Sequence, residues 1–115
     1  MLTCVIRYHI DPTKKDQFAE YARNWGQAIP RCGADLIGYF APHEGSSTLA
    51  YGIYNIPSLA DYEAYRARLT NDPLGQENYA FAQSQKFLLR EERTWLKLAS
   101  GPHAAVQQHP SGEPT

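Results

Sequence analysis

The fold is decided by residues 2–9, which read Leu-Thr-Cys-Val-Ile-Arg-Tyr-His. Apolar side chains recur at every second position, so Leu2, Cys4, Ile6 and Tyr8 fall on one face of a β-strand. Residues 11–30 have a different period, because their apolar side chains recur at spacings of three and four. This change of period predicts a half-buried strand followed by an amphipathic helix that ends near Pro30.

The rest of the chain repeats this order of elements. We expect strands within residues 34–41 and 47–56, joined by a turn, and then a helix from residue 59 to about residue 69. Asp72-Pro73 ends that helix and can begin a short third helix over about residues 75–86, although Gly75 weakens it. A last strand is expected at residues 87–98. The order βαββαβ predicts the α+β class and a ferredoxin-like protomer, in which a four-stranded antiparallel sheet carries its helices on one face.

The second face of this sheet is too apolar to lie in water. It offers Val5, alternating residues within 36–40 and 49–54, and Trp95. An exposed apolar face of that extent marks an interface. We therefore predict a homodimer in which two sheets pack face to face around a two-fold axis.

Length and charge limit the domain count and the partners. A chain of 115 residues forms one domain, which we place at residues 1–99, and residues 100–115 are expected to be a flexible C-terminal tail. Eleven basic and twelve acidic residues argue against nucleic acid and against an anionic membrane as partners. No apolar run could span a bilayer and no export signal precedes the first strand, so we expect a cytoplasmic protein.

Residues 52–62 read Gly-Ile-Tyr-Asn-Ile-Pro-Ser-Leu-Ala-Asp-Tyr, and Arg66, Leu69 and Asp72-Pro73 follow. Together with residues 8–14 and 38–40, this run resembles the NIPSNAP family, and the resemblance extends over about residues 3–98. The resemblance implies a dimeric α+β barrel, and so the same sheet-to-sheet homodimer. It implies no defined reaction.

The chain departs from the family's pattern at three places. Arg7 and Tyr8 are adjacent, whereas the family commonly separates these two residue types by one position. Tyr62 stands where the family often has an arginine, and Leu74-Gly75 stands where it has a tryptophan. Roles that depend on the family's side chains at these positions are therefore not transferred to this chain.

Arg7, His9 and Tyr51 are the candidates for catalysis. An arginine can hold a carboxylate or an enolate, and a histidine can act as an acid, a base or a proximal haem ligand. A surface histidine at a strand end, and an interfacial ion pair of arginine with Glu91 or Asp35, are the structural alternatives for the charged residues.

The candidates for binding a substrate are Tyr39, Tyr51, Arg93 and Trp95. Aromatic rings with polar tips can hold a phenolic or quinone-like molecule by stacking and hydrogen bonding. The same tyrosines could also be core residues whose hydroxyls are satisfied by neighbours.

Three functions remain open. The first is a homodimeric small-molecule-binding or accessory protein. The second is a cofactor-independent enzyme similar to the antibiotic biosynthesis monooxygenases, acting on a small aromatic ligand, and the third is a haem-binding barrel with His9 as ligand. We expect no metal site, because His103 and His109 lack the spacing of a helical metal pair, and we expect no cofactor.

Overall fold

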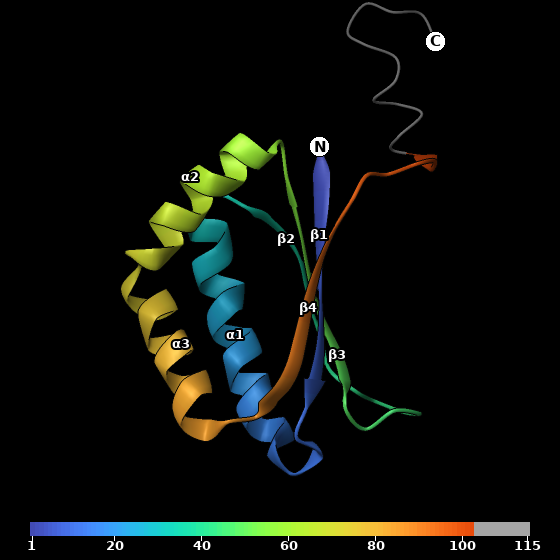
Figure 1. Ribbon diagram of the computed structural model, residues 1–115, viewed down its shortest axis with the longest axis vertical. Helices are drawn as coiled ribbons and strands as arrows, with labels where there is room; N and C mark the ends of the chain where they lie inside the picture. Colours follow the sequence, from blue (N-terminus) through green and yellow to red (C-terminus); the bar gives the residue numbers. More distant parts are fainter. Residues whose placement is uncertain (103–115) are drawn as a thin grey trace, which may run out of the picture.

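The computed structural model describes residues 1–102, and the expected tail lies, from residue 103 on, outside the described residues. A four-stranded antiparallel sheet in the order β2-β3-β1-β4 carries the helices of residues 15–85 on one face (Figure 1). This confirms the predicted α+β, ferredoxin-like protomer. Along the chain the elements are β1 (Leu2–Ile10), a 3-10 turn (Pro12–Lys14), α1 (Lys15–Arg31), β2 (Asp35–Phe40), β3 (Leu49–Ile56), α2 (Leu59–Thr70), α3 (Pro73–Gln85) and β4 (Leu88–Leu96).

Strand β1 and helix α1 form the centre of the core. The alternation predicted for β1 is confirmed, because Cys4, Ile6, Tyr8 and Ile10 are all buried beneath the helices. The Asp11 carboxylate accepts a hydrogen bond from the Thr13 N–H at 2.9 Å and so caps the turn that leads into α1. The apolar stripe of α1 lies against the sheet, and its buried members are Phe18, Tyr21, Trp25, Ala28 and Ile29.

The third helix is longer than the sequence predicts, and it begins two residues earlier, at Pro73. Gly75 does not break it. A Cβ at this position would lie 2.8 Å from the Leu69 carbonyl oxygen, so glycine allows α3 to start directly against the end of α2. Within residues 1–102, no helix is both long and apolar enough to cross a bilayer.

Trp95 lies on the side opposite to the one predicted. In the β1–β4 ladder Trp95 pairs with Cys4, whereas Thr94 pairs with Val5. Residues paired across two antiparallel strands share a face, so Trp95 points toward the helices with Cys4. Its indole contacts Tyr62 of α2, with the ring centroids 4.7 Å apart.

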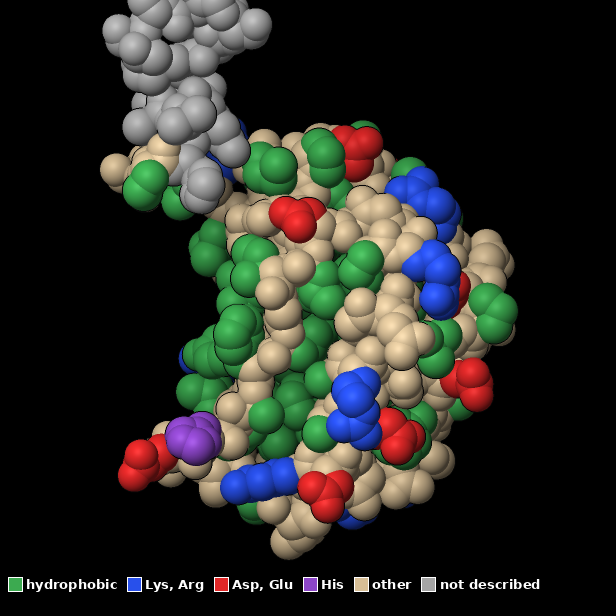
Figure 2. All heavy atoms as spheres, turned by 180° about the vertical axis from the view of Figure 1, so that it is seen from behind, with side chains coloured by type: hydrophobic (Ala, Val, Ile, Leu, Met, Phe, Trp, Pro, Cys, Tyr) green, Lys and Arg blue, Asp and Glu red, His purple; other side chains and the backbone are tan. Residues whose placement is uncertain are grey.

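The sheet face away from the helices, called the open face below, is uncovered in the single chain. Cross-strand pairs place Val5 beside Ile53, and Arg7 beside Tyr51, on this face. Figure 2 views the molecule from behind and shows hydrophobic side chains lining its hollowed side, opposite the helices. Charged side chains follow the β4 edge of this face, where Arg7 and Glu92 form an ion pair of 3.3 Å.

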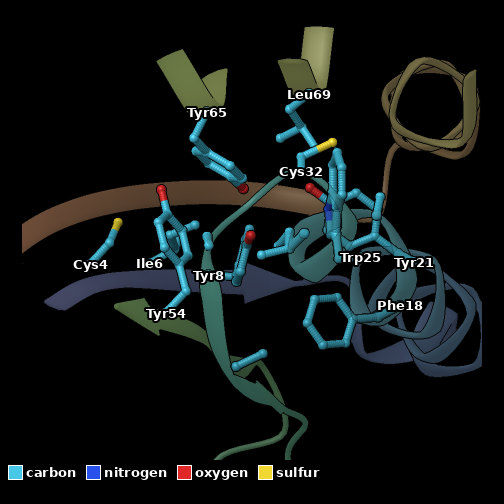
Figure 3. Packing of buried hydrophobic residues seen from close by; sticks show 14 of the residues in the cluster. Cys4, Ile6, Tyr8, Phe18, Tyr21, Trp25, Cys32, Tyr54, Tyr65 and Leu69 are labelled. Atoms are coloured by element: carbon cyan, nitrogen blue, oxygen red, sulfur yellow. The ribbon is translucent and has the colours of Figure 1, made fainter. Parts of the chain in front are cut away.

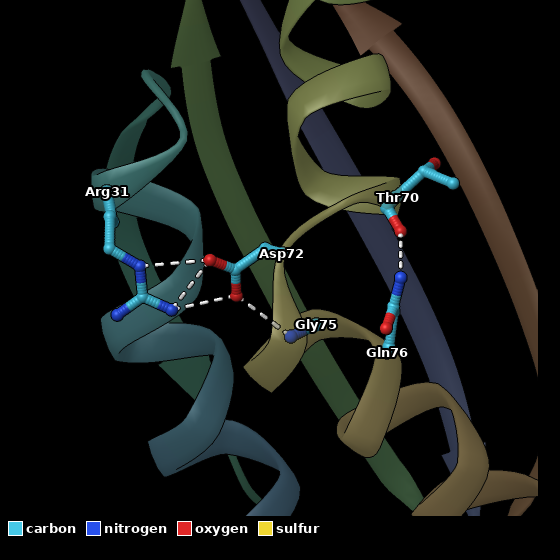
Figure 4. Close-up of polar contacts among 5 residues, drawn as sticks. All are labelled: Arg31, Thr70, Asp72, Gly75 and Gln76. Carbon is cyan, nitrogen blue, oxygen red and sulfur yellow. Dashed lines mark hydrogen bonds and ion pairs between the residues drawn. The ribbon is translucent and has the colours of Figure 1, made fainter.

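One residue, Asp72, joins α1 to the start of α3 (Figure 4). Its carboxylate accepts hydrogen bonds from the Arg31 guanidinium at 2.7–3.0 Å and from the Gly75 N–H at 3.0 Å. Asp72 is therefore both an ion-pair partner and the N-cap of α3. The Arg31 guanidinium, followed by the N–H groups of α3, lowers the pKa of Asp72 below its ordinary value of 3.8.

We expect Asp72→Asn to lower the Tm at neutral pH. The difference in Tm between this variant and the parent protein should become smaller as the pH falls. A carboxyl whose pKa is depressed by folding stabilises the protein above its unfolded-state pKa, and this contribution is lost as the pH falls through the folded-state pKa. The check is thermal unfolding followed by circular dichroism from neutral pH down to about pH 3. The Tm difference between Arg31→Gln and the parent should decrease in acid in the same way. If the Tm differences of both variants do not change with pH, the role of Asp72 as ion-pair partner of Arg31 is contradicted.

Candidate ligand pocket

A cavity of about 70 Å³ lies between the sheet and the helices, and tyrosines dominate its lining. Seven of the eight tyrosines of the chain line it, and Tyr51 is the exception. We call this cavity the tyrosine pocket. Its lining residues come from every strand and every α-helix: Ile6, Tyr8, Tyr21, Trp25, Ile29, Tyr39, Tyr54, Tyr62, Tyr65, Arg66, Leu69, Tyr79, Glu91 and Arg93.

The sheet supplies the floor of the pocket. Tyr39 of β2 lies flat on Gly52 of β3, where an added Cβ would be 2.6 Å from the Tyr39 Cζ atom. The Tyr39 hydroxyl is 3.1 Å from the hydroxyl of Tyr8, which rises from β1. Because Gly52 has no side chain, the Tyr39 ring can pack against the backbone of β3 and place its hydroxyl beside that of Tyr8.

We expect Gly52→Ala to displace the Tyr39 ring, to break its hydroxyl contact with Tyr8 and to destabilise the fold by about 1–3 kcal/mol, the usual effect of overpacking. The matched control is Gly26→Ala in α1, where a Cβ meets nothing within 4 Å. Glycine to alanine at an unhindered helical position should stabilise by about 0.5–1 kcal/mol. Urea denaturation of both variants tests the pair, and equal shifts in the same direction would contradict the close approach.

The helices supply the roof. Tyr65 of α2 is only 2% exposed, and in Figure 3 its hydroxyl points from α2 toward the sheet, where the Tyr8 hydroxyl points up toward it. Tyr21 of α1 packs edge-on against Tyr8 and Trp25, with centroid distances of 6.2 and 5.7 Å. Such edge-to-face contacts fix ring orientations while leaving the polar tips free to reach the cavity.

Burial keeps the pocket hydroxyls protonated. It raises the pKa of Tyr8 and Tyr39 well above the ordinary value, and it raises the pKa of Tyr21 to about 12. Burial also raises the pKa of Tyr54 and Tyr65. At neutral pH these hydroxyls are therefore neutral hydrogen-bond donors, and a tyrosinate is not available there as a general base.

Charged groups from β4 and α2 line one side of the pocket. Arg93 and Glu91 follow each other on the helix side of β4, and the guanidinium and carboxylate are 3.7 Å apart. Burial acts to lower the pKa of Arg93, but Tyr62, Tyr54, Cys4 and Glu91 together raise it. Arg66 of α2 also lines the cavity, so two cations face one anion.

The structure separates the candidate residues into two groups. Tyr39 and Arg93 line the tyrosine pocket, and Trp95 lies beside it against Tyr62. Arg7, His9 and Tyr51 lie together on the open face instead. There Arg7 pairs with Glu92, and the His9 Nδ1 atom is 3.3 Å from the Thr48 hydroxyl.

Several pocket residues were not among the candidates: Tyr8, Tyr21, Tyr62, Tyr65, Tyr79, Arg66 and Glu91. A signal existed for two of them. Tyr8 occupies the buried phase of β1, and Tyr21 occupies the apolar stripe of α1. A tyrosine at a core position carries a hydroxyl that needs a partner, so the coincidence of these positions could have indicated a polar cavity in the core.

The size of the pocket decides what it can hold. An apolar cavity that admits benzene has about 150 Å³, about twice the volume present here. Neither an aromatic substrate nor a porphyrin fits in the pocket as it stands. Within residues 1–102, no group of three His, Cys, Asp or Glu side chains is placed to hold a metal ion.

Comparison with known proteins agrees with the fold. The NIPSNAP family model matches residues 3–102. A solved structure of an uncharacterized NIPSNAP domain protein from Burkholderia xenovorans is 25% identical with a TM-score of 0.69, covering 87% of this chain and 96% of that one. A NIPSNAP family protein with unknown function from Agrobacterium tumefaciens is 22% identical, with a TM-score of 0.73 and coverages of 89% and 92%.

A more distant structure has the same fold. A putative antibiotic biosynthesis monooxygenase from Nitrosomonas europaea is 12% identical, with a TM-score of 0.67, and the match covers 87% of this chain and 100% of that one. At this identity the likeness concerns the fold alone. A comparison with curated proteins gave no match.

Proposed function

Since the chain belongs to the NIPSNAP family, we propose that it is a homodimeric protein that binds a small molecule in the tyrosine pocket. The observation that carries this proposal is the lining of the pocket. Neutral hydroxyls and an arginine converge there on a partly enclosed space, and convergent polar groups in an otherwise apolar cavity are the usual form of a ligand site. Protein cores contain few voids larger than a water molecule, and this space is larger than that.

The homodimer is supported by the open face. Ile37 and Phe40 of β2 are 54% and 49% exposed, and they continue the apolar surface of Val5 and Ile53. An apolar sheet face of this extent is stabilised when a partner covers it, and a second copy of the same face is the simplest self-complementary partner. We also propose a cytoplasmic location, with which the free thiols of Cys4 and Cys32 agree.

A cofactor-free monooxygenase is the second candidate. Arg93 favours it, because a guanidinium beside hydroxyl donors could stabilise a developing enolate. The pocket volume counts against it, since an aromatic substrate would have to displace several lining rings. Binding without chemistry therefore remains the first proposal.

The test is native mass spectrometry of the protein purified from its own cells, compared with the spectrum after denaturation. We expect a dimer that carries a small ligand, which denaturation releases. Gly52→Ala, which pushes Tyr39 into the pocket, should abolish the ligand but keep the dimer. A bare monomer from the parent protein would overturn both parts of the proposal, and a ligand retained in Gly52→Ala would place the site elsewhere.

A further inference from the structure

The chemical class of the ligand follows from the charges and the hydroxyls of the tyrosine pocket; this inference rests on the proposed function. The pocket contains two cations, Arg93 and Arg66, and one anion, Glu91. Its remaining polar side-chain groups are the tyrosine hydroxyls and the indole N–H of Trp25. Two guanidiniums against one carboxylate leave the lining with a positive charge in excess, and together with the hydroxyl donors this favours an anionic ligand.

Arg93 is free to accept such a partner. Its guanidinium lies 3.7 Å from the Glu91 carboxylate, which is beyond hydrogen-bond distance, so its N–H donors are not used by that pair. A guanidinium presents its donors as a fork that matches the two oxygens of a carboxylate. Glu91 then serves to hold the position of Arg93 while leaving the fork available.

Tyr65 provides a second, independent indication. It is 98% buried, since only 2% is exposed, yet its hydroxyl makes no hydrogen bond with another of the residues 1–102, and it points into the pocket. The hydroxyl itself is not fully enclosed, so it is an unused donor that a molecule in the pocket can reach. An anion held by Arg93 would give this donor an acceptor.

The volume limits the size of the ligand. About 70 Å³ is less than half of the space that admits benzene, so the acid has only a few heavy atoms. We propose that the tyrosine pocket binds the carboxylate of a small aliphatic organic acid, with Arg93 as its ion-pair partner and Tyr65 as a hydrogen-bond donor.

The test is a chemical-shift titration of the ¹⁵N-labelled full chain with acetate, at constant ionic strength. Acetamide, which has the same shape without the charge, is the matched ligand control, and benzoate is the control for size. We expect saturable shifts along β4 with acetate, an affinity for acetamide lower by about tenfold or more, and no saturable binding of benzoate. Equal affinity for acetate and acetamide, or tight binding of benzoate, would overturn the proposal.

Variants assign the binding to the pocket. Arg93→Gln should raise the Kd for acetate by about tenfold or more, because it removes a charge-assisted interaction, and Tyr65→Phe should raise it by a smaller factor. Arg23→Gln, on the exposed side of α1, is the matched arginine control and should leave the Kd unchanged. If Arg93→Gln does not fold by circular dichroism, Arg93→Lys keeps the charge without the fork and should bind acetate with intermediate affinity.

The outcomes separate this inference from the function on which it rests. Native mass spectrometry could find an uncharged ligand that is absent from Gly52→Ala, while acetate does not bind. The tyrosine pocket would then be the ligand site, but the proposal that it binds a carboxylate would be wrong. If no acid binds and no ligand is found, both are wrong. An equal loss of acetate binding in Arg93→Gln and Arg23→Gln would show a nonspecific charge effect and overturn the assignment.

Discussion

Replacing Ile53 with aspartate is expected to abolish the proposed homodimer while leaving the protomer folded. Ile53 is on the inner strand β3, between Val5 of β1 and Gly38 of β2, at the middle of the open face. In the protomer a carboxylate at this position lies in water. In the dimer it would be buried without a cationic partner beside it, at an effective cost of several kcal/mol for each copy.

Light scattering coupled to size exclusion measures this result directly. Leu59→Asp is the matched control, because Leu59 is 55% exposed at the start of α2, away from the open face, and should leave the dimer intact. Circular dichroism shows whether each variant is folded. A folded Ile53→Asp protein that remains dimeric would contradict the sheet-to-sheet interface.

Truncating Phe18 to alanine is expected to produce the largest loss of stability, about 3–5 kcal/mol. Phe18 is fully buried, and its ring packs against Tyr8 and Phe87 with centroid distances of 5.7 and 6.5 Å. The cavity left behind would lie next to the pocket floor, because Tyr39 also contacts this ring. Rings locked by several aromatic neighbours relax poorly into such a space, so most of the cavity cost should remain.

Urea denaturation at a fixed protein concentration checks this prediction, since the stability of a dimer depends on concentration. The exposed Leu59→Ala is the control and should change the free energy of unfolding by no more than about 0.5 kcal/mol. A loss from Phe18→Ala no larger than that of the control would mean that the aromatic core is loosely packed.

The elements could be predicted from the sequence because their periods are local. Alternation in β1 and the three-to-four spacing in α1 are both visible within short windows, and both buried faces were identified correctly. Trp95 could not be placed in the same way. Its face depends on the register of β4 against β1, and because both faces of the sheet carry apolar residues, hydrophobicity could not choose between them.

The candidate site was predicted only in part for a similar reason. Strict alternation would put Leu36 and Tyr39 on opposite faces of β2. The register shifts between Leu36 and Gly38, so both residues pair with helix-facing positions of β3. Tyr51 lies outside the pocket because side chains alternate along β3, and its neighbour Gly52 occupies the position that faces the helices. The pocket itself joins residues from every strand and helix, and no local pattern specifies such a meeting.

The Gly52–Tyr39 contact also shows that the two proposed binding sites, the tyrosine pocket and the open face, lie on opposite faces of the same strand, β3. Gly52 lies beneath Tyr39 on the helix side of β3, while its neighbours Tyr51 and Ile53 lie on the open face, where the second copy is proposed to bind. A ligand that moved Tyr39 toward Gly52 would therefore act on the backbone that positions the proposed interface. Linkage is reciprocal: by whatever factor the acid strengthens or weakens the association of two copies, association changes the affinity for the acid by the same factor.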